Sequence, residues 1–448
     1  MQMRAIIVGA GEVGYQIARF LVLEKIDVVI VEKDPAKTSR ISEELDVATV
    51  SGDGLSPSAL KEAGAEKADI LLAVTNSDET NMISCLIAKA MFDIPRKIAR
   101  IRNPEYFRNE KLLSRENLDI DPAISPEYEV ARAIVRLLET PFATEVEELE
   151  DGLIKIIGFR VPDESALVGK TLKSFQKLPS KKFLIGIIRR DDHIVIPSGE
   201  DSVEAGDIIY MPVKKWEVGD ALGFLGVTGK PAKKVMIVGG GRIGFYIASA
   251  MEARADVKII DRDAERCKFI SKSLSKSTVL HGDGSDEKLL KEENIADMDA
   301  FVAVSNNEEL NMMASILAKR LGVQKTITIV NRTDYLSLAH GLGLQAVLSP
   351  RLITASSILK YVRRGDILSL TAVAEDRAEI IEARVGNGSG FIGKPLKQAR
   401  LPKSVVVGAV MRGEKIIIPT GEDIINEGDK LVIFALRESI PDVEKFLV

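Results

Sequence analysis

The chain has 448 residues, enough for two to four domains that each bury a core of their own. Hydrophobic residues make up 46% and charged residues 28%, and a formal net charge of −5 gives no general attraction for nucleic acid or an anionic membrane. Cys85 and Cys267 show no disulfide or metal-ligand spacing, the N-terminus shows no signal peptide, and no charge-free stretch reaches the ~20 apolar residues of a membrane span. We therefore expect a cytoplasmic, globular protein without a zinc site.

The second half of the chain repeats the first. VGAGEVG at 8–14 returns as VGGGRIG at 238–244, and AVTNSDETNM at 73–82 returns as AVSNNEELNM at 303–312, both 230 residues on (241 − 11; 303 − 73). Ser125-Pro126 returns as Ser349-Pro350 at an offset of 224, and IVIPSGEDSVEAGD at 194–207 returns at 416–429 at an offset of 222. Because the offset drifts so little, the whole half is duplicated.

In chain order, each half predicts a large lobe and then a small one. From Arg4 to Glu139, short β-branched runs alternate with stretches of helical spacing, which favours βαβ units in a doubly wound parallel sheet. Residues 144–213 change to short alternating runs typical of a β-rich lobe, and a glycine-dotted stretch follows. The predicted fold class is α/β, with two Rossmann-like sheets, each followed by a small β-rich α+β lobe. The expected domains are 1–140, 141–217, a linker at 218–232, 233–364 and 365–448.

The glycine turn at 8–14 has the surroundings of a dinucleotide-binding turn. A buried-strand run precedes it and a helical pattern follows it. Gly9 permits the tight turn, Gly11 lets the backbone approach a pyrophosphate, and Gly14 lets the helix pack on the strand. The N-terminus of that helix offers free N–H groups and positive dipole to phosphates. The turn at 238–244 repeats this arrangement.

An acidic residue follows each glycine turn at the end of the next strand-like run. Glu32 lies 21 residues beyond Gly11, and Asp261 lies 20 beyond Gly241. A carboxylate there accepts hydrogen bonds from ribose hydroxyls and repels a 2′-phosphate. We therefore expect NAD(H) or another adenine nucleotide rather than NADP(H).

Further candidates follow the third, fourth and fifth runs. Asp53 and Asp283 are placed to meet an adenine amino group, whereas Thr75 and Asn76, with Ser305 in the second half, stand at the mouth of the crevice. Asp78 and Glu308 are expected to cap the helix that begins there. Arg100 and Arg102 could pair with phosphate, but their counterparts are Ile329 and Asn331, while Arg242 stands where the first turn has Glu12. We infer two non-equivalent nucleotide sites.

No pattern in the sequence indicates catalysis. There is no P-loop, and His193, His281 and His340 have neither metal-like spacing nor a place beside a substrate domain. Two nucleotide cradles without catalytic groups suggest a sensor whose ligand shifts a conformational equilibrium. An NAD-dependent oxidoreductase and a soluble redox sensor remain alternatives.

With these motifs, the chain resembles the TrkA-type regulatory subunits of Trk potassium-uptake systems, which carry two tandem RCK (or KTN) domains. The resemblance covers essentially the whole chain, since GAGEVG, Glu32, GDG, AVTNSDETN, ARIRNPEY, VGKTL and IPSGED fall in that family's order. It implies a non-enzymatic protein that assembles as a ring, expected to be a tetramer, beneath an integral-membrane potassium-translocating subunit. NAD(H) is the implied cofactor, with ATP or ADP as further ligands, and no nucleic acid.

The resemblance also implies which residues bind the nucleotide. Gly14, Gly244 and Asp283 join them as members of the repeated motifs. The candidate set is Gly9, Ala10, Gly11, Glu12, Val13, Gly14, Glu32, Asp53, Thr75, Asn76 and Arg100 in the first half, and Gly239, Gly240, Gly241, Arg242, Ile243, Gly244, Asp261, Asp283 and Ser305 in the second. No metal ligand and no catalytic residue is expected.

Overall fold

The computed structural model describes residues 3–447 except 24, 108, 151, 176–182, 192, 228, 333, 360, 362–366, 374–377, 391, 400 and 403. The chain forms two compact units. One comprises Met1–Ala131 with Ser349–Val362, and the other comprises Arg132–Leu348 with Arg363–Val448.

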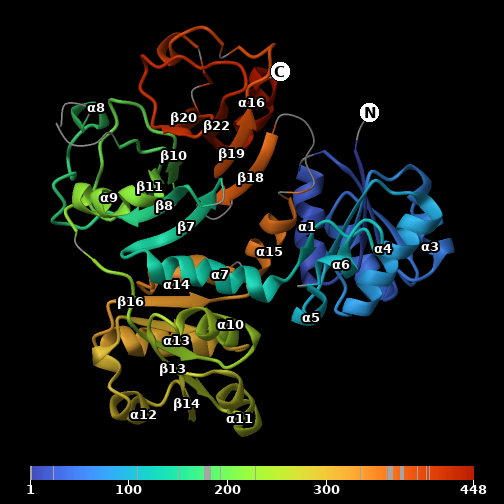
Figure 1. Cartoon of the computed structure of the whole chain (residues 1–448), viewed down its shortest axis with the longest axis horizontal. Coiled ribbons are helices and arrows are strands. Elements are labelled where there is room, and N and C mark those ends of the chain that lie inside the picture. Colours follow the sequence, from blue (N-terminus) through green and yellow to red (C-terminus); the bar gives the residue numbers. More distant parts are fainter. Residues whose placement is uncertain are drawn as a thin grey trace. The chain divides into compact units, whose positions relative to one another are not determined.

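The first unit is built on a six-stranded parallel sheet (Figure 1). Its strand order is β3-β2-β1-β4-β5-β6, the doubly wound order in which the chain reverses direction between β1 and β4. The strands are β1 (Arg4–Val8), β2 (Asp27–Glu32), β3 (Ala48–Ser51), β4 (Ile70–Ala73), β5 (Arg96–Arg100) and β6 (Ala123–Ile124). Because both faces are covered by helices, β1 and β4 read as continuous apolar runs.

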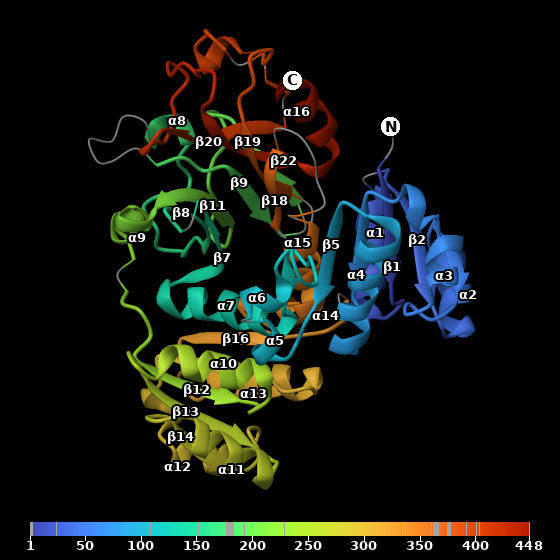
Figure 2. The same cartoon turned by 45° about the vertical axis from the view of Figure 1, so that its right-hand side comes forward.

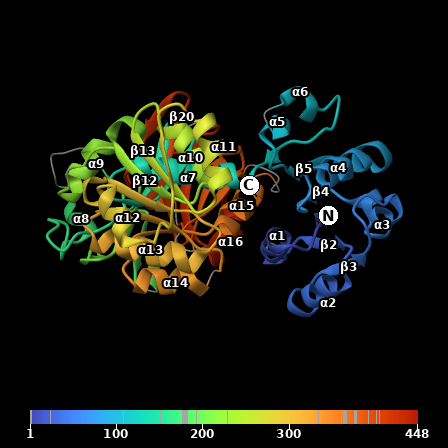
Figure 3. The ribbon, with the colours of Figure 1, turned by 90° about the horizontal axis from the view of Figure 1, so that it is seen from below.

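Helices cover the two faces of this sheet, as Figure 3 shows for α1 on one face and α4 on the other. Helices α1 and α2 bury residues such as Ile17 and Ile41 in one core, and α3 and α4 bury Leu60 and Cys85 in the other. The helices of this lobe are α1 (Glu12–Leu23), α2 (Pro35–Glu44), α3 (Pro57–Glu62), α4 (Asp78–Phe92), α5 (Pro104–Phe107) and α6 (Glu110–Leu113).

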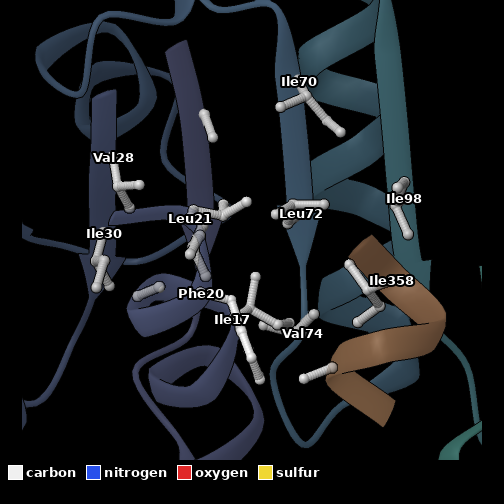
Figure 4. Close-up of a cluster of buried hydrophobic side chains, with 14 of the residues drawn as sticks. Ile17, Phe20, Leu21, Val28, Ile30, Ile70, Leu72, Val74, Ile98 and Ile358 are labelled. Carbon is white, nitrogen blue, oxygen red and sulfur yellow. The ribbon is translucent and has the colours of Figure 1, made fainter. Parts of the chain in front are cut away.

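A helix from the second half of the sequence completes the first core. Helix α15 (Pro350–Leu359) packs against α1, and its Ala355 and Ile358 are fully buried. Figure 4 shows Ile358 beside Val74 and Ile98 in this core. At the end of this segment, the Arg96 guanidinium donates a hydrogen bond to the Tyr361 carbonyl. The first Rossmann-like lobe is therefore covered by a helix encoded 224 residues after its own exit helix (350 − 126).

The second unit contains a matching parallel sheet with the order β14-β13-β12-β15-β16-β17. Its strands are β12 (Lys234–Val238), β13 (Asp256–Asp261), β14 (Thr278–His281), β15 (Ala300–Ala303), β16 (Lys325–Ile329) and β17 (Ala346–Leu348). Its helices are α10 (Arg242–Met251), α11 (Ala264–Ser273), α12 (Glu287–Glu292), α13 (Glu308–Arg320) and α14 (Asp334–Gly341).

Helix α7 (Pro126–Glu139) belongs to this unit from Arg132 onward and lies along the second sheet, beside β16 (Figures 1 and 2). Lys325 Nζ donates to the carbonyl oxygens of Leu137 and Thr140, at 2.7 Å for Thr140. Arg254 forms an ion pair with Glu139. The C-terminal end of α7 is thus held by the Lys325 amino group at the start of β16 and by Arg254.

The two small lobes each contain a five-stranded antiparallel sheet, with the orders β10-β9-β11-β8-β7 and β18-β19-β22-β20-β21. Buried residues of both sheets, such as Ile156, Tyr210, Ile380 and Phe434, form one core, so the sheets pack face to face. The strands are β7 (Ala143–Leu149), β8 (Ile154–Arg160), β9 (Ile187–Arg190), β10 (His193–Val195), β11 (Ile208–Lys214), β18 (Ile367–Val373), β19 (Ala378–Arg384), β20 (Val405–Arg412), β21 (Lys415–Ile417) and β22 (Lys430–Leu436). The helices are α8 (Leu172–Phe175), α9 (Val218–Leu225) and α16 (Ile440–Leu447).

The repeated IPSGED and EAGD segments of these lobes have structural roles. Asp201 accepts hydrogen bonds from the backbone and hydroxyl of Ser198 and closes a turn. Buried Asp207 forms a two-pronged pair with Arg190, at 2.9 Å for both contacts, and Asp429 does the same with Arg412. The hydrogen bonds of these carboxylates therefore hold the loops of the small lobes in place.

The predicted fold class is confirmed, since two Rossmann-like sheets are each accompanied by a small antiparallel sheet. The segment 218–232, expected to be a linker, begins with α9, whose Ala221, Leu222 and Leu225 are buried. Its role as a linker stays a prediction. The other domain boundaries stay predictions. Among the helices that the structure describes, none is long and apolar enough to cross a membrane.

Candidate nucleotide-binding site

In the first glycine turn, two glycines are required by the folded chain. Gly9 has a φ of +107°, and a Cβ there would come within 3.1 Å of Thr75. A Cβ on Gly14 would lie 2.0 Å from the carbonyl oxygen of Gly9. These positions hold glycine because strand β1, the turn and α1 approach one another closely.

Gly11 has a different reason to be glycine. A Cβ built on it meets no protein atom within 4 Å, and its φ lies outside the left-handed region. Its carbonyl accepts the Tyr15 N–H at 2.8 Å, so Gly11 stands at the start of α1, ahead of Glu12 and Val13. Gly11 directly precedes α1, so a side chain there would stand in open space beside the helix N-terminus, where backbone N–H groups attract phosphate. The absence of a side chain there therefore fits a ligand phosphate.

Glu32 organises the turn. One of its carboxylate oxygens accepts the Ala10 N–H at 2.7 Å, and the other accepts the Asp34 N–H at 3.1 Å. The residue is only 8% exposed. Each oxygen keeps a second lone pair, so the carboxylate can hold the turn and still accept a ribose hydroxyl.

The residues that follow β4 hold the loops after β4 and β5 in place. Asn81 is fully buried, accepts the Thr75 N–H and hydroxyl at 2.8 and 2.7 Å, and donates to the Arg100 carbonyl. Ser77, not Asp78, caps α4. Asp78 instead accepts backbone N–H groups of Arg102 and Asn103 at 2.8–3.0 Å, so the capping role expected for it is wrong. Asp78 is the first residue of the helix, and its side chain reaches the loop after β5.

Asn76, Arg100 and Arg102 meet at the carboxyl edge of the first sheet. Exposed Asn76 accepts hydrogen bonds through Oδ1 from Arg100 Nη1 at 3.1 Å and from Arg102 Nη2 at 2.8 Å. Two guanidinium groups thus converge on one amide at the carboxyl edge of the sheet. Asp53 is also exposed at this edge, where its carboxylate accepts the Leu55 N–H at 3.0 Å.

The second glycine turn repeats the first in its backbone. Gly239 has a φ of +108°, a Cβ on Gly244 would lie 2.0 Å from the Gly239 carbonyl oxygen, and a Cβ on Gly241 would meet nothing within 4 Å. Asp261 accepts the Gly240 N–H at 2.6 Å, as Glu32 accepts that of Ala10. Arg242 and Ile243 open α10.

The rim of the second turn differs. Ser305 is held by buried Asn311, as Thr75 is by Asn81. Arg332 pairs with Asp334 at 2.7 Å and lies over the ring of Tyr335. Glu308, like Asp78, was expected to cap its helix, but Asn307 is the cap, and Glu308 accepts the N–H groups of Asn331 and Arg332. The paired arginines of the first rim therefore have no equivalent here.

Asp283, which follows β14, is engaged by its own loop and by the loop after β13. Although burial raises its pKa, hydrogen bonds from the Ser285 N–H and hydroxyl and the ion pair with Arg262 lower the pKa below that of an ordinary aspartate. Asp283 therefore stays ionised and can accept a hydrogen bond from an amino group.

One residue that the motifs did not indicate lies beside the first turn. Arg351 of α15 forms an ion pair with Glu12 at 2.8 Å. No local pattern could have revealed Arg351, because it comes from the other half of the sequence.

The histidines of the described part of the chain bind backbone groups or are exposed. No group of three or more His, Cys, Asp or Glu residues there could hold a metal ion. His281 makes a hydrogen bond of 2.9 Å with the Arg262 carbonyl, and His340 one of 3.2 Å with that of Leu344. His193 is exposed at the start of β10.

Two domain families match this chain, each of them twice. The TrkA-N domain matches residues 5–126 and 235–350, and the TrkA-C domain matches residues 156–215 and 380–448. Curated relatives match over nearly the full length. The "Trk system potassium uptake protein TrkA" of Azorhizobium caulinodans is 37% identical, with 99% of this chain and 98% of that protein covered. A TrkA homolog 1 of Methanosarcina mazei is 36% identical, with 99% and 100% covered.

Solved structures share the fold. The "GsuK channel bound to NAD" aligns with a TM-score of 0.64 at 16% identity, covering all of this chain and 79% of that one. The "Crystal Structure of the GsuK RCK domain" aligns with a TM-score of 0.63 at 17% identity, covering all of this chain and 95% of that one. These likenesses extend over both halves of the chain.

Proposed function

The chain belongs to the TrkA family, and from that membership we propose that it is a regulatory subunit of a potassium-uptake system that responds to adenine nucleotides. One observation carries the nucleotide part of this proposal. In both halves, a glycine that the folded chain does not need leaves space over a helix N-terminus, with a carboxylate bound to the adjacent turn. Phosphates at the helix end and ribose hydroxyls at the carboxylate satisfy both features.

The first site favours nucleotides with a free ribose 2′-hydroxyl. Glu32 is buried and its position is fixed by two backbone N–H groups, so it cannot turn away from an added 2′-phosphate. NAD(H), ATP and ADP are therefore the proposed ligands, and NADP(H) is disfavoured. Isothermal titration of the full chain with NADH and NADPH tests this preference, and equal affinity for the two would contradict it.

The proposed output is a change in conformation rather than a reaction. A ligand shifts an equilibrium only if it binds one state more tightly, and coupling of this kind is typically ~1–3 kcal/mol. In the first unit, α15 packs against α1, the helix that follows the first glycine turn. A nucleotide at that turn can therefore favour one placement of these two helices over another.

We propose an integral-membrane potassium-translocating subunit as the partner, with the chain bound to it at the cytoplasmic face as a homo-oligomeric ring. Curated relatives are named for Trk potassium uptake.

The test is potassium flux through a reconstituted Trk membrane subunit, with and without this chain, titrated with ATP, ADP and NADH. We expect flux that depends on the protein and changes with the nucleotide. Flux that is indifferent to the chain under every nucleotide condition would contradict the proposal. A parallel assay of NADH oxidation tests the oxidoreductase alternative, and sustained turnover with an added substrate would support that alternative instead.

A further inference from the structure

Arg351 lies at the first turn of α15, on the helix face that packs against α1. Positions 351, 355 and 358 share one face of a helix, and Ala355 and Ile358 are fully buried in the core of the first Rossmann-like lobe (Figure 4). Burial of these two residues fixes the backbone of α15 against α1. The side chain of Arg351 is therefore directed to the N-terminal end of α1 by packing within this unit.

At that end, Arg351 Nη1 lies 2.8 Å from Glu12 Oε2. Glu12 directly follows Gly11 and is the first residue of α1. The Glu12 side chain is 55% exposed and that of Arg351 27%, and a pair so open to solvent adds little to stability. The cation is thus held beside the proposed phosphate position by a contact that is easily exchanged.

We propose that Arg351 is a phosphate ligand of the first nucleotide site and exchanges Glu12 for phosphate oxygens when a nucleotide binds. This inference rests on the proposed nucleotide-binding function. A guanidinium group binds phosphate through two parallel N–H donors, and its contact with a doubly charged terminal phosphate is stronger than with an esterified one. Arg351 therefore favours nucleotides that end in a phosphate, such as ADP and ATP, over NADH, whose diphosphate bridge is esterified to a ribose at each end and has no terminal phosphate.

The preference is specific to the first site. By the offset of 224, the residue equivalent to Arg351 is Glu127, and by the offset of 230 the residue equivalent to Glu12 is Arg242. The charges of the two positions are exchanged between the halves. In the second half the cation is carried by the glycine turn itself, whereas the first site takes its cation from a helix of the other half of the sequence.

The test measures ADP, ATP and NADH binding to the full chain by isothermal titration, in a Gly241→Val background that reports the first site. We expect Arg351→Ala to weaken ADP and ATP binding by about tenfold and NADH binding by no more than about threefold. Glu12→Gln removes the competing carboxylate and should tighten ATP binding by about threefold. That gain should vanish in the Glu12→Gln, Arg351→Ala double variant.

Arg4→Ala is the matched control. Arg4 belongs to the same lobe and pairs with Asp27 at the same 2.8 Å, but at the amino end of β1, so its loss should leave every affinity unchanged. Arg351→Lys, which keeps the charge, should bind ATP with intermediate affinity. Unchanged ATP affinity in folded Arg351→Ala and Glu12→Gln proteins would overturn this inference and leave the proposed function standing. A parent protein that binds no nucleotide would overturn both.

Discussion

The two glycine turns share their backbone and differ at their rims. In both, the first glycine has a φ near +107°, the third has a Cβ position 2.0 Å from the carbonyl oxygen of the first, and a carboxylate binds the N–H of the residue between the first and second. At the rims, Arg100 and Arg102 converge on Asn76 in the first half, whereas Arg332 pairs with Asp334 in the second.

This difference separates the residues that form the glycine turn from the charged residues that we expect to select its ligand. The features that keep strand, turn and helix together are the same in both halves, because a change there would disrupt the lobe. The charged groups around the turn differ, and they decide how strongly an anionic ligand is attracted. We therefore expect equivalent substitutions in the two glycine turns to have similar effects in both halves. Substitutions at a rim should change nucleotide affinity only in the half that contains that rim.

The largest expected effect is loss of binding on Gly11→Val. The new side chain enters the space over the helix N-terminus, so affinity at the first site should fall by about a hundredfold or more, ~3 kcal/mol. Gly241→Val should act equally and independently in the second half. Titration calorimetry of each variant and of the double variant measures this, with circular dichroism as the control for folding. Unchanged stoichiometry and affinity in Gly11→Val would show that the turn serves packing only and does not bind the nucleotide.

Gly14→Ala should act on stability rather than directly on the ligand. Its Cβ would collide with the Gly9 carbonyl oxygen, and overpacking of this kind costs about 2–3 kcal/mol. Gly11→Ala, whose Cβ meets no protein atom, is the matched control and should have the same Tm as the parent protein. Thermal unfolding of the two variants gives the comparison, and equal Tm values for them would show that the close approach is not real.

A pH-dependent difference is expected between the C-terminal ends of α7 and α15, which contact Lys325 and Arg96 respectively. Burial lowers the pKa of Lys325 to about 7 from an ordinary 10.5, whereas the equivalent contact to Tyr361 in the first unit is made by Arg96, and arginines stay charged in this range. Between these values the unfolded chain holds more protons than the folded one, so the free energy of unfolding rises with pH from 7 toward 10.5. Below pH 7 Lys325 is charged in the folded chain as well, so its burial lowers the free energy of unfolding by the full amount.

Lys325→Met removes this dependence. Because Lys325 keeps some contact with solvent, we expect only part of the full effect. The difference in the free energy of unfolding, variant minus wild type, should be about 1–2 kcal/mol larger at pH 7 than at pH 9. Arg96→Met should show no such change. Calorimetric unfolding at both pH values measures the difference, and a Lys325→Met effect that is the same at both would contradict a lowered pKa.

The smallest expected effect concerns the rim. Arg100→Ala removes one of the two guanidinium groups at Asn76 and should weaken nucleotide binding at the first site three- to tenfold, about 1 kcal/mol. The second site, which has Ile329 at that position, should be unaffected. Site-resolved titration in the Gly241→Val and Gly11→Val backgrounds distinguishes the two. Equal losses at both sites would argue against separate rims.

The sequence predicted the parts of the fold that depend on local pattern. Buried β-branched runs and helical spacing indicated both doubly wound sheets, and the repeat indicated that each small lobe follows a large one. The exchange of α7 and α15 between the lobes could not be predicted, because helical periodicity shows which face is apolar but not which surface covers it. For the same reason, Arg351 was not a candidate.

At the sites, spacing identified the glycines and the acidic residues but not how the latter are used. The motif does not reveal that Glu32 and Asp261 bind the turn's own backbone. The role of Asp78 was wrong because Ser77, one residue earlier, is the better cap and frees the carboxylate to bind the loop after β5. Ligand binding by the candidate residues stays a prediction.

The most direct test of the central claim, two non-equivalent nucleotide sites in one chain, is the stoichiometry of adenine nucleotide binding. Titration of the nucleotide-free full chain with ATP, followed by calorimetry and native mass spectrometry, should give two bound nucleotides per chain with clearly different affinities. Gly11→Val should remove one class of site and Gly241→Val the other. Two sites of identical affinity, or a single site that neither variant removes, would contradict the account.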